Sequence, residues 1–161
     1  MREAYVGVGS NQDADRHLIE AWNALRERFT GARCSSVYRS AAVGVAAPDY
    51  LNMVVGFSTD LDPDELKQQL RALEERAGRP RTAPRGALCP LDLDLLLYGR
   101  RVDPQRRLPH ADVLRRVFVL APLAELAPTL VHPLTGEPYE HAWRALAARD
   151  GGISRVGALR A

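Results

Sequence analysis

Two aspartates lie two positions apart in a short apolar run of the chain, residues 91–98. A run this short and this apolar predicts a buried β-strand. Because the side chains of a strand alternate between its faces, Asp92 and Asp94 are expected to leave by the same face, roughly 6–7 Å apart along the chain. Mg²⁺ binds carboxylate and phosphate oxygens, so this spacing suits a pair of divalent cations on a polyphosphate. The alternative is a half-exposed edge strand with two solvated aspartates, because the pattern Asp-x-Asp is common.

Basic residues flank this strand on both sides along the chain. The Pro- and Gly-rich segment 78–87 holds three arginines, Arg79 and Arg81 among them, and His110 and Arg116 follow the strand. Two neighbouring carboxylates raise each other's pKa, so a positive group is expected to face them. Guanidinium groups bind phosphate in a bidentate manner, which makes the loop a candidate phosphate clamp. A solvated basic loop is the alternative.

Seven segments of the chain resemble, in order, those of the 6-hydroxymethyl-7,8-dihydropterin pyrophosphokinase family of folate biosynthesis. The matching segments are residues 4–11, 35–40, 48–52, 78–81 with Glu74, 91–94, 109–110 with Arg116 and Phe118, and 122–128. The resemblance implies a transferase that moves pyrophosphate from ATP to the hydroxymethyl group of the pterin and releases AMP. It also implies two Mg²⁺ ions, bound together with ATP.

The resemblance implies a role for single residues in each segment. Asp92 and Asp94 would hold the metal ions, and neither side chain is expected to have another structural partner. With Arg79 and Arg81, these two aspartates form the expected catalytic set. The expected nucleotide contacts are Glu74, Arg79, Arg81, His110 and Arg116. Ordinary loop, turn or helix surface chemistry is the alternative for Arg79, Arg81, His110 and Glu74.

The resemblance also implies a pterin pocket. Its expected residues are Ser40, Val43, Tyr50, Asn52 and Phe118. A pterin is flat and rich in donors and acceptors, so it suits aromatic faces above and below and an amide at its edge. Tyr50 and Phe118 have an ordinary place in the hydrophobic core as their alternative.

The chain departs from the family pattern beside the aspartates. Cys89 and Pro90 stand where the family usually has Arg-Thr, and Gly86 stands where many members have Trp. Loss of a charge-assisted contact costs about 1.5–3 kcal/mol, so a slow enzyme is expected. A divergent member that binds pterin or nucleotide with weak or altered transfer is the alternative.

Length and composition are typical of a small enzyme with small-molecule substrates. The 161 residues carry a formal net charge of +2, which favours neither nucleic acid nor membranes as partners. Lys67 is the only lysine, so a phosphate clamp here must be built of arginine. Cys34 and Cys89 are too few for a disulfide framework, so a reduced cytoplasm is expected. We expect a monomer, with residues 1–161 forming a single domain.

Hydrophobic periodicity and turn residues predict the elements that must position the site. Strands are expected over residues 4–8, 34–39, 51–59 and 91–98, and helices over 17–29, from the Asp62 cap to 77, over 114–126 with a break at Pro122, and over 141–149. Residues 150–161 are expected to form a loose tail. The order predicts an α/β sandwich with a ferredoxin-like βαββαβ core and extra C-terminal elements. An RNA-binding module of the same fold is a second class, but it would need aromatic residues on an open sheet face.

Overall fold

A six-stranded antiparallel sheet forms the centre of the protein in the computed structural model, which describes residues 1–80 and 88–160. In chain order the elements are β1 (Arg2–Ser10), α1 (Ala14–Arg28), β2 (Thr30–Cys34), β3 (Val37–Ser40), β4 (Tyr50–Thr59), α2 (Pro63–Arg76), β5 (Asp92–Tyr98), the 3₁₀ turns η1 (Pro104–Arg106) and η2 (Ala111–Val113), α3 (Val117–Leu126), α4 (Tyr139–Ala147) and β6 (Ile153–Gly157). The strand order is β5-β1-β4-β3-β6, with β2 also paired to β4. This arrangement confirms the ferredoxin-like α/β fold.

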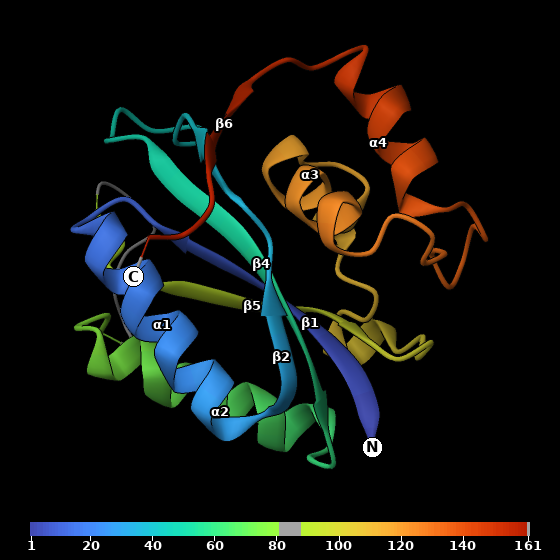
Figure 1. Cartoon of the computed structure of the whole chain (residues 1–161), viewed down its shortest axis with the longest axis horizontal. Helices are drawn as coiled ribbons and strands as arrows, with labels where there is room; N and C mark the ends of the chain where they lie inside the picture. The colour runs from blue at the N-terminus through green and yellow to red at the C-terminus, as the bar shows by residue number, and fades with distance from the viewer. Residues whose placement is uncertain (81–87, 161) are drawn as a thin grey trace.

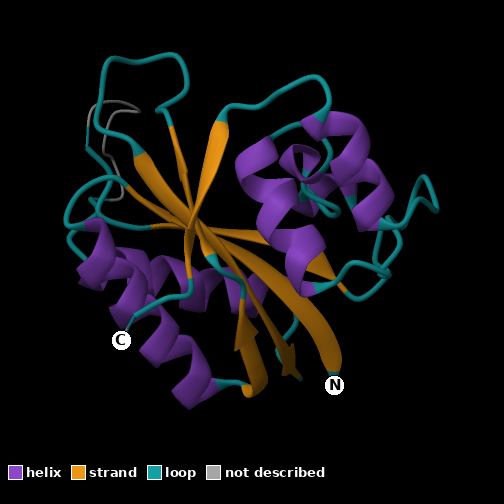
Figure 2. Cartoon of the chain, turned by 45° about the horizontal axis from the view of Figure 1, so that its top comes forward, coloured by secondary structure: helices purple, strands orange, loops and turns teal. Residues whose placement is uncertain are grey.

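Helices cover both faces of the sheet (Figures 1 and 2). Helices α1 and α2 lie against one face, and α3 and α4 lie against the other. Each layer closes its own hydrophobic core, the first including Val6, Phe57 and Leu66, the second including Leu96, Leu123 and Tyr139. The extra C-terminal elements of the prediction therefore form a complete second layer.

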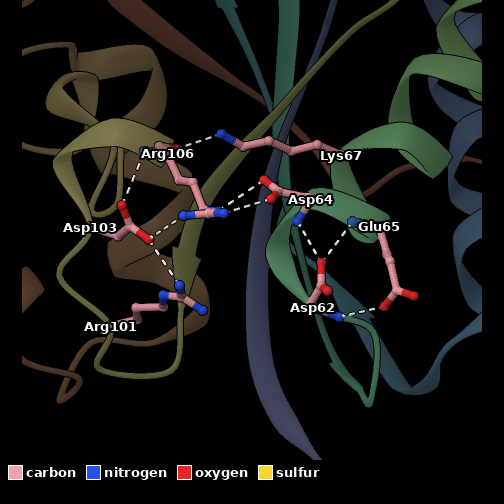
Figure 3. Close-up of polar contacts among 7 residues, drawn as sticks. All are labelled: Asp62, Asp64, Glu65, Lys67, Arg101, Asp103 and Arg106. Carbon is pink, nitrogen blue, oxygen red and sulfur yellow. Dashed lines mark hydrogen bonds and ion pairs between the residues drawn. The ribbon is translucent and has the colours of Figure 1, made fainter.

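Helix α2 begins at the Asp62 cap that its sequence predicts, and the structure adds a capping box with Glu65 (Figure 3). The Asp62 carboxylate accepts hydrogen bonds from the backbone N–H groups of Asp64 and Glu65, each at 2.9 Å. The Glu65 carboxylate in turn accepts the Asp62 N–H at 2.9 Å. Pro63 takes the first helical position, where its missing N–H costs nothing. The start of α2 is thus set by local chemistry.

The strand expected over residues 34–39 is instead divided into β2 and β3. At the division, the Ser35 hydroxyl accepts the Val54 N–H at 2.9 Å. The Ser36 N–H donates to the Glu125 carboxylate of α3 at 2.8 Å. The Ser35 N–H still donates to the Val54 carbonyl at 2.9 Å, but the Ser36 N–H donates to a side chain and not to a neighbouring strand, so the single-strand prediction was wrong there.

The C-terminal half departs from the prediction in two places. Helix α3 begins at Val117 and continues through Pro122, because the buried residues around the proline pack it into the second core. The break expected at Pro122 was therefore wrong. The prediction of a loose tail over residues 150–161 was wrong for Ile153–Gly157. These residues form β6, which pairs with β3 from Val37 to Ser40. Arg155 adds a hydrogen bond to the Ser36 hydroxyl at 2.8 Å.

We predict that Asp62→Ala lowers the free energy of unfolding by about 1 kcal/mol, because two backbone N–H groups of α2 lose their acceptor. Asp62→Asn is the matched control, since asparagine caps equally well and keeps the stability near that of the unaltered protein. Urea denaturation of the two variants measures the difference. Equal stability of Asp62→Ala and the unaltered protein would contradict a role for the cap.

Candidate active site

Two cavities meet at the start of β5. The larger has a volume of about 990 Å³ and lies against β1, β4 and the segment before α3. The smaller, about 680 Å³, is a groove between α2 and residues 105–110. The residues that line both are Arg79, Pro80, Asp92, Asp94, Arg107 and His110. The two aspartates therefore lie where two bound molecules would meet.

Strand alternation places the two carboxylates as the sequence predicts. Leu93 and Leu95 belong to the core beneath α1 and α2, while Asp92 and Asp94 line the larger cavity on the opposite face together with Leu96. Next to them in the sheet are two glycines of β1. Gly7 is the register partner of Asp94, and Gly9 is the partner of Asp92.

Arg79 neutralises one of the two aspartates. Its Nη1 lies 2.6 Å from Asp92 Oδ1 and 2.5 Å from Glu74 Oε2. Glu74 is held in turn by the Leu93 N–H, which donates to the same Oε2 at 3.2 Å. The expectation that Asp92 has no structural partner was wrong, whereas the expected positive group beside the pair is present.

Burial and a neighbouring like charge both disfavour the ionised form of Asp94. Burial and the neighbouring Asp92 carboxylate raise the pKa of Asp94 to about 6. Among the residues that the structure describes, none forms an ion pair with Asp94. A cation at the junction of the two cavities would relieve this repulsion, so the site is electrostatically prepared for positive charge.

His110 lines both cavities. Its Nδ1 accepts the Asp112 N–H at 3.1 Å, and the backbone N–H of His110 donates to the Leu96 carbonyl at 2.9 Å. A nitrogen that accepts carries no proton, so in the neutral ring the proton sits on Nε2. His110 can therefore donate a hydrogen bond to an anion in the junction.

The other residues expected at the nucleotide divide between the cavities. Glu74 lines the groove, and Arg116 lines the larger cavity. Arg81 lies outside the described residues, as does Gly86. The expected nucleotide contacts thus approach the junction from two sides.

The residues expected around a pterin come together around the larger cavity. Ser40, Val43, Tyr50, Asn52 and Phe118 all line it. The Asn52 amide nitrogen donates to Ser40 Oγ at 2.9 Å and to the Tyr38 carbonyl at 3.4 Å. Within the described chain, nothing donates to Asn52 Oδ1. This buried amide is therefore held in place with its acceptor available to a ligand.

Sequence reasoning missed the floor of this cavity, which β1 makes with Gly7 and Gly9. A Cβ atom on Gly9 would lie 3.3 Å from Asn52 Oδ1 and 3.6 Å from a ring carbon of Tyr50. The absent side chains leave room for a flat ring. The available signal was the spacing of two residues, because glycines two apart in a strand bare one face of it.

Cys89, where the family usually has arginine, lies on the wall of the larger cavity. Two hydrogen bonds from Asn11 hold the backbone of Cys89. Asn11 Oδ1 accepts the Cys89 N–H at 2.6 Å, and the backbone N–H of Asn11 donates to the Cys89 carbonyl at 3.1 Å. Burial raises the pKa of the thiol, which is hydrogen-bonded to Tyr50. Among the described residues, the guanidinium that contacts Asp92 is that of Arg79.

The fold and the paired cavities define an enzyme site for two substrates. A family model described as 7,8-dihydro-6-hydroxymethylpterin-pyrophosphokinase (HPPK) matches residues 5–128. A 2-amino-4-hydroxy-6-hydroxymethyldihydropteridine pyrophosphokinase from Synechocystis sp. is 49% identical over 139 residues, which cover 83% of this chain and 71% of that protein. The protein of the same name from Haemophilus influenzae is 36% identical over 139 residues, with 83% and 86% covered. The chain belongs to the 7,8-dihydro-6-hydroxymethylpterin-pyrophosphokinase family.

Solved structures agree with the fold. The wild-type HPPK-DHPS of Plasmodium falciparum with pteroate superposes with a TM-score of 0.77 at 10% identity, covering 96% of this chain and 47% of that one. Its A437G variant with SDX-DHP gives a TM-score of 0.79 at 10% identity, covering 96% and 48%. The chain thus spans about half the length of these two structures.

We predict that Asp94→Asn stabilises the metal-free protein at neutral pH. The folded pKa of Asp94 is about 6, above the roughly 3.9 of an unfolded chain. Its contribution to stability is therefore fully present below about pH 4 and is lost as the pH rises through about 6. Urea denaturation in EDTA should show a gain on the order of 2 kcal/mol at about pH 7.5 that disappears below about pH 4. A gain that does not depend on pH would contradict the shifted carboxyl.

We predict that Gly9→Ala weakens the binding of a pterin in the larger cavity and leaves ATP binding unchanged. The new methyl group would crowd the Asn52 amide oxygen at 3.3 Å. Gly151→Ala, at an exposed position with open space around it and no positive φ, is the control for general effects of the substitution. Equal loss of both ligands in Gly9→Ala would place the pterin elsewhere.

Proposed function

We propose that the chain transfers pyrophosphate from ATP to 6-hydroxymethyl-7,8-dihydropterin, the activity from which its family takes its name. The observation that carries the proposal is the position of Asp92 and Asp94 at the junction of two cavities. One cavity has the aromatic and amide groups that suit a pterin. The other is a groove with basic residues, which suits a nucleotide polyphosphate. Of the nucleotide, only the phosphates need to reach the junction of the two cavities.

The reaction joins the two ligands at the β-phosphorus. The hydroxymethyl oxygen of the pterin forms a bond to the β-phosphorus, the bond from that phosphorus to the α,β-bridging oxygen breaks, and AMP leaves. The hydroxyl proton is released as the new ester forms. Because the phosphoryl oxygens carry the developing charge, the protein acts chiefly by positioning and by electrostatics. In this proposal His110 donates through Nε2 to a phosphate oxygen.

Asp92 and Asp94 are the proposed ligands of two Mg²⁺ ions that bind with ATP. Within the described residues, no cluster of three or more histidine, cysteine, aspartate or glutamate side chains could hold a metal alone. The donor set nevertheless fits Mg²⁺, which commonly takes one or two carboxylates and completes its coordination with phosphate and water. Bound Mg²⁺ would supply charge neutralisation on the bridging and terminal phosphate oxygens.

Arg79 would change partners when substrate arrives. In the structure its guanidinium holds Asp92 Oδ1, an oxygen that the proposal gives to a metal ion. Once Asp92 is neutralised otherwise, Arg79 keeps its bond to Glu74 and becomes available to phosphate. Arg81 and Arg116 complete the proposed phosphate contacts, and Glu74 anchors the group from α2.

The pterin is proposed to lie over the β1 glycines. Tyr50 and Phe118 would meet its faces, and Asn52 Oδ1 would accept from its edge. Ser40 keeps the Asn52 amide oriented, and Val43 contributes the rim of the cavity.

The RNA-binding alternative lacks its required surface, because helices cover both faces of the sheet (Figure 2). We propose a monomer in the cytoplasm that acts on small molecules and binds no nucleic acid. No helix in residues 1–80 and 88–160 combines the length and apolar character needed to cross a bilayer.

We predict that the protein with ATP, Mg²⁺ and 6-hydroxymethyl-7,8-dihydropterin releases AMP and not ADP. Asp92→Ala and Asp94→Ala should each abolish this release, because the metal loses a carboxylate, while both variants stay folded. Chromatography of the nucleotides measures the products, and circular dichroism checks the fold. ADP as the product would disprove the assignment.

We predict that Asn52→Ala raises the Kd for the pterin tenfold or more, about 1.4 kcal/mol, and leaves the Kd for ATP within about twofold. Buried donors on the pterin edge would lose their acceptor in this variant. Asn23→Ala, at an amide of α1 outside both cavities, is the control. Calorimetric titration with each ligand separates the two effects. Equal losses for both ligands would contradict the assigned pocket.

A further inference from the structure

Arg107 has an unusual backbone at the junction of the two cavities. Its φ of 55° and ψ of 46° place it in the left-handed region, which is unfavourable for a residue with a Cβ atom. In the described chain it shares a positive φ only with Asp13 among residues other than glycine. Arg107 lines both cavities together with Asp92 and Asp94. Backbone strain of this kind tends to be kept at functional sites.

The residue after Arg107 is firmly anchored. Leu108 is 2% exposed and belongs to the first hydrophobic core. Its N–H donates to the Asp103 carbonyl at 3.0 Å, and its carbonyl accepts the Asp103 N–H at 2.7 Å. The backbone on the C-terminal side of Arg107 is therefore held in place.

The residue before Arg107 is fixed from the opposite side of the groove (Figure 3). The Arg106 guanidinium reaches α2, where its Nε and Nη2 donate to the two oxygens of Asp64 at 2.9 and 2.7 Å. Its Nη1 donates to Asp103 Oδ2 at 3.1 Å. The ammonium of Lys67 donates to the Arg106 carbonyl. Arg106 thus ties the segment that carries Arg107 to the helix that forms the other wall of the groove.

The groove carries charges of both signs, because its lining includes Lys67, Arg71, Arg79 and Arg107 together with Glu74, Glu75, Asp92 and Asp94. Burial lowers the pKa of Lys67, and the like charges of Arg107 and Arg71 lower it further. Arg79 is already paired with Glu74 and Asp92. By contrast, no described residue forms an ion pair with the guanidinium of Arg107. Its charge is therefore available to an anion without the loss of an internal partner.

On the basis of the proposed function, we propose that Arg107 is a further phosphate-binding residue, which meets the triphosphate of ATP where it crosses the junction. Arg106 is its positioning residue and acts only through the backbone of Arg107. The strained conformation is the means by which a residue between two fixed neighbours directs its side chain to the cavities.

Arg107→Gln tests the contact. The probe is the ATP analogue with a methylene group in place of the α,β-bridging oxygen, titrated with Mg²⁺. Loss of a charge-assisted contact should raise its Kd tenfold to a hundredfold, an effect of about 1.4–2.8 kcal/mol, with the Kd for the pterin unchanged. Arg107→Lys should recover part of the affinity. Arg100→Gln, an exposed arginine of the same segment outside both cavities, is the matched control and should bind as the unaltered protein does.

Arg107→Gly separates function from structure. Glycine adopts the left-handed region without strain, so the thermal midpoint should hold or rise. The affinity for the analogue should nevertheless fall as in Arg107→Gln. A purely structural arginine would leave the affinity of the glycine variant intact, and that result would overturn the proposal.

A double-mutant cycle tests the role of Arg106. Arg106→Ala alone should raise the Kd for the analogue at least threefold, but it should add nothing in the Arg107→Gln background. Independent, additive losses would overturn the positioning role. Unchanged affinity in Arg107→Gln would overturn the contact itself. Because the analogue is not turned over, these outcomes stand apart from the AMP assay, whose failure would remove the proposed reaction but not the binding result.

Discussion

The repulsion between Asp92 and Asp94 is the constraint on which the site depends. Two carboxylates on one face of β5 are tolerable only if positive charge is close, and among the described residues only Asp92 has an ion-pair partner, Arg79. Asp94 remains partly buried with a raised pKa. A site with one balanced and one unbalanced carboxylate attracts cations, and this imbalance is retained because both neighbouring positions of β1 are glycines without any group that could compensate it.

Helix α2 supports the site in two separate ways. Near its C-terminal end, Glu74 holds Arg79 against the carboxylates. Near its N-terminal end, Asp64 and Lys67 hold Arg106. The capping box that begins α2 belongs to the same helix, although none of its hydrogen bonds reaches the cavities.

Two features of its lining suit the larger cavity to a flat ligand: the missing side chains on β1 and the available acceptor of Asn52. The β1 glycines have no side chains, and the amide nitrogen of Asn52 donates to Ser40 Oγ and to the Tyr38 carbonyl. An amide that satisfies its donors inside the protein loses no hydrogen bond when a ligand arrives, and it offers a single acceptor in a fixed direction. This arrangement favours a flat ligand with donors along one edge.

The sequence by itself determined the features that depend on neighbours along the chain. Strand alternation put Asp92 and Asp94 on one face, the Asp62 cap and Pro63 began α2, and the element order with the family motifs led to the ferredoxin-like fold. Only the tertiary structure decided which charges meet. Three contacts join segments that are distant in sequence: the ion pair of Arg79 with Asp92, the ion pair of Arg106 with Asp64 of α2, and the pairing of β6 with β3. Local periodicity does not predict such partners. Local chemistry sets where elements begin and which face they bury, whereas long-range pairing is set by packing the whole chain.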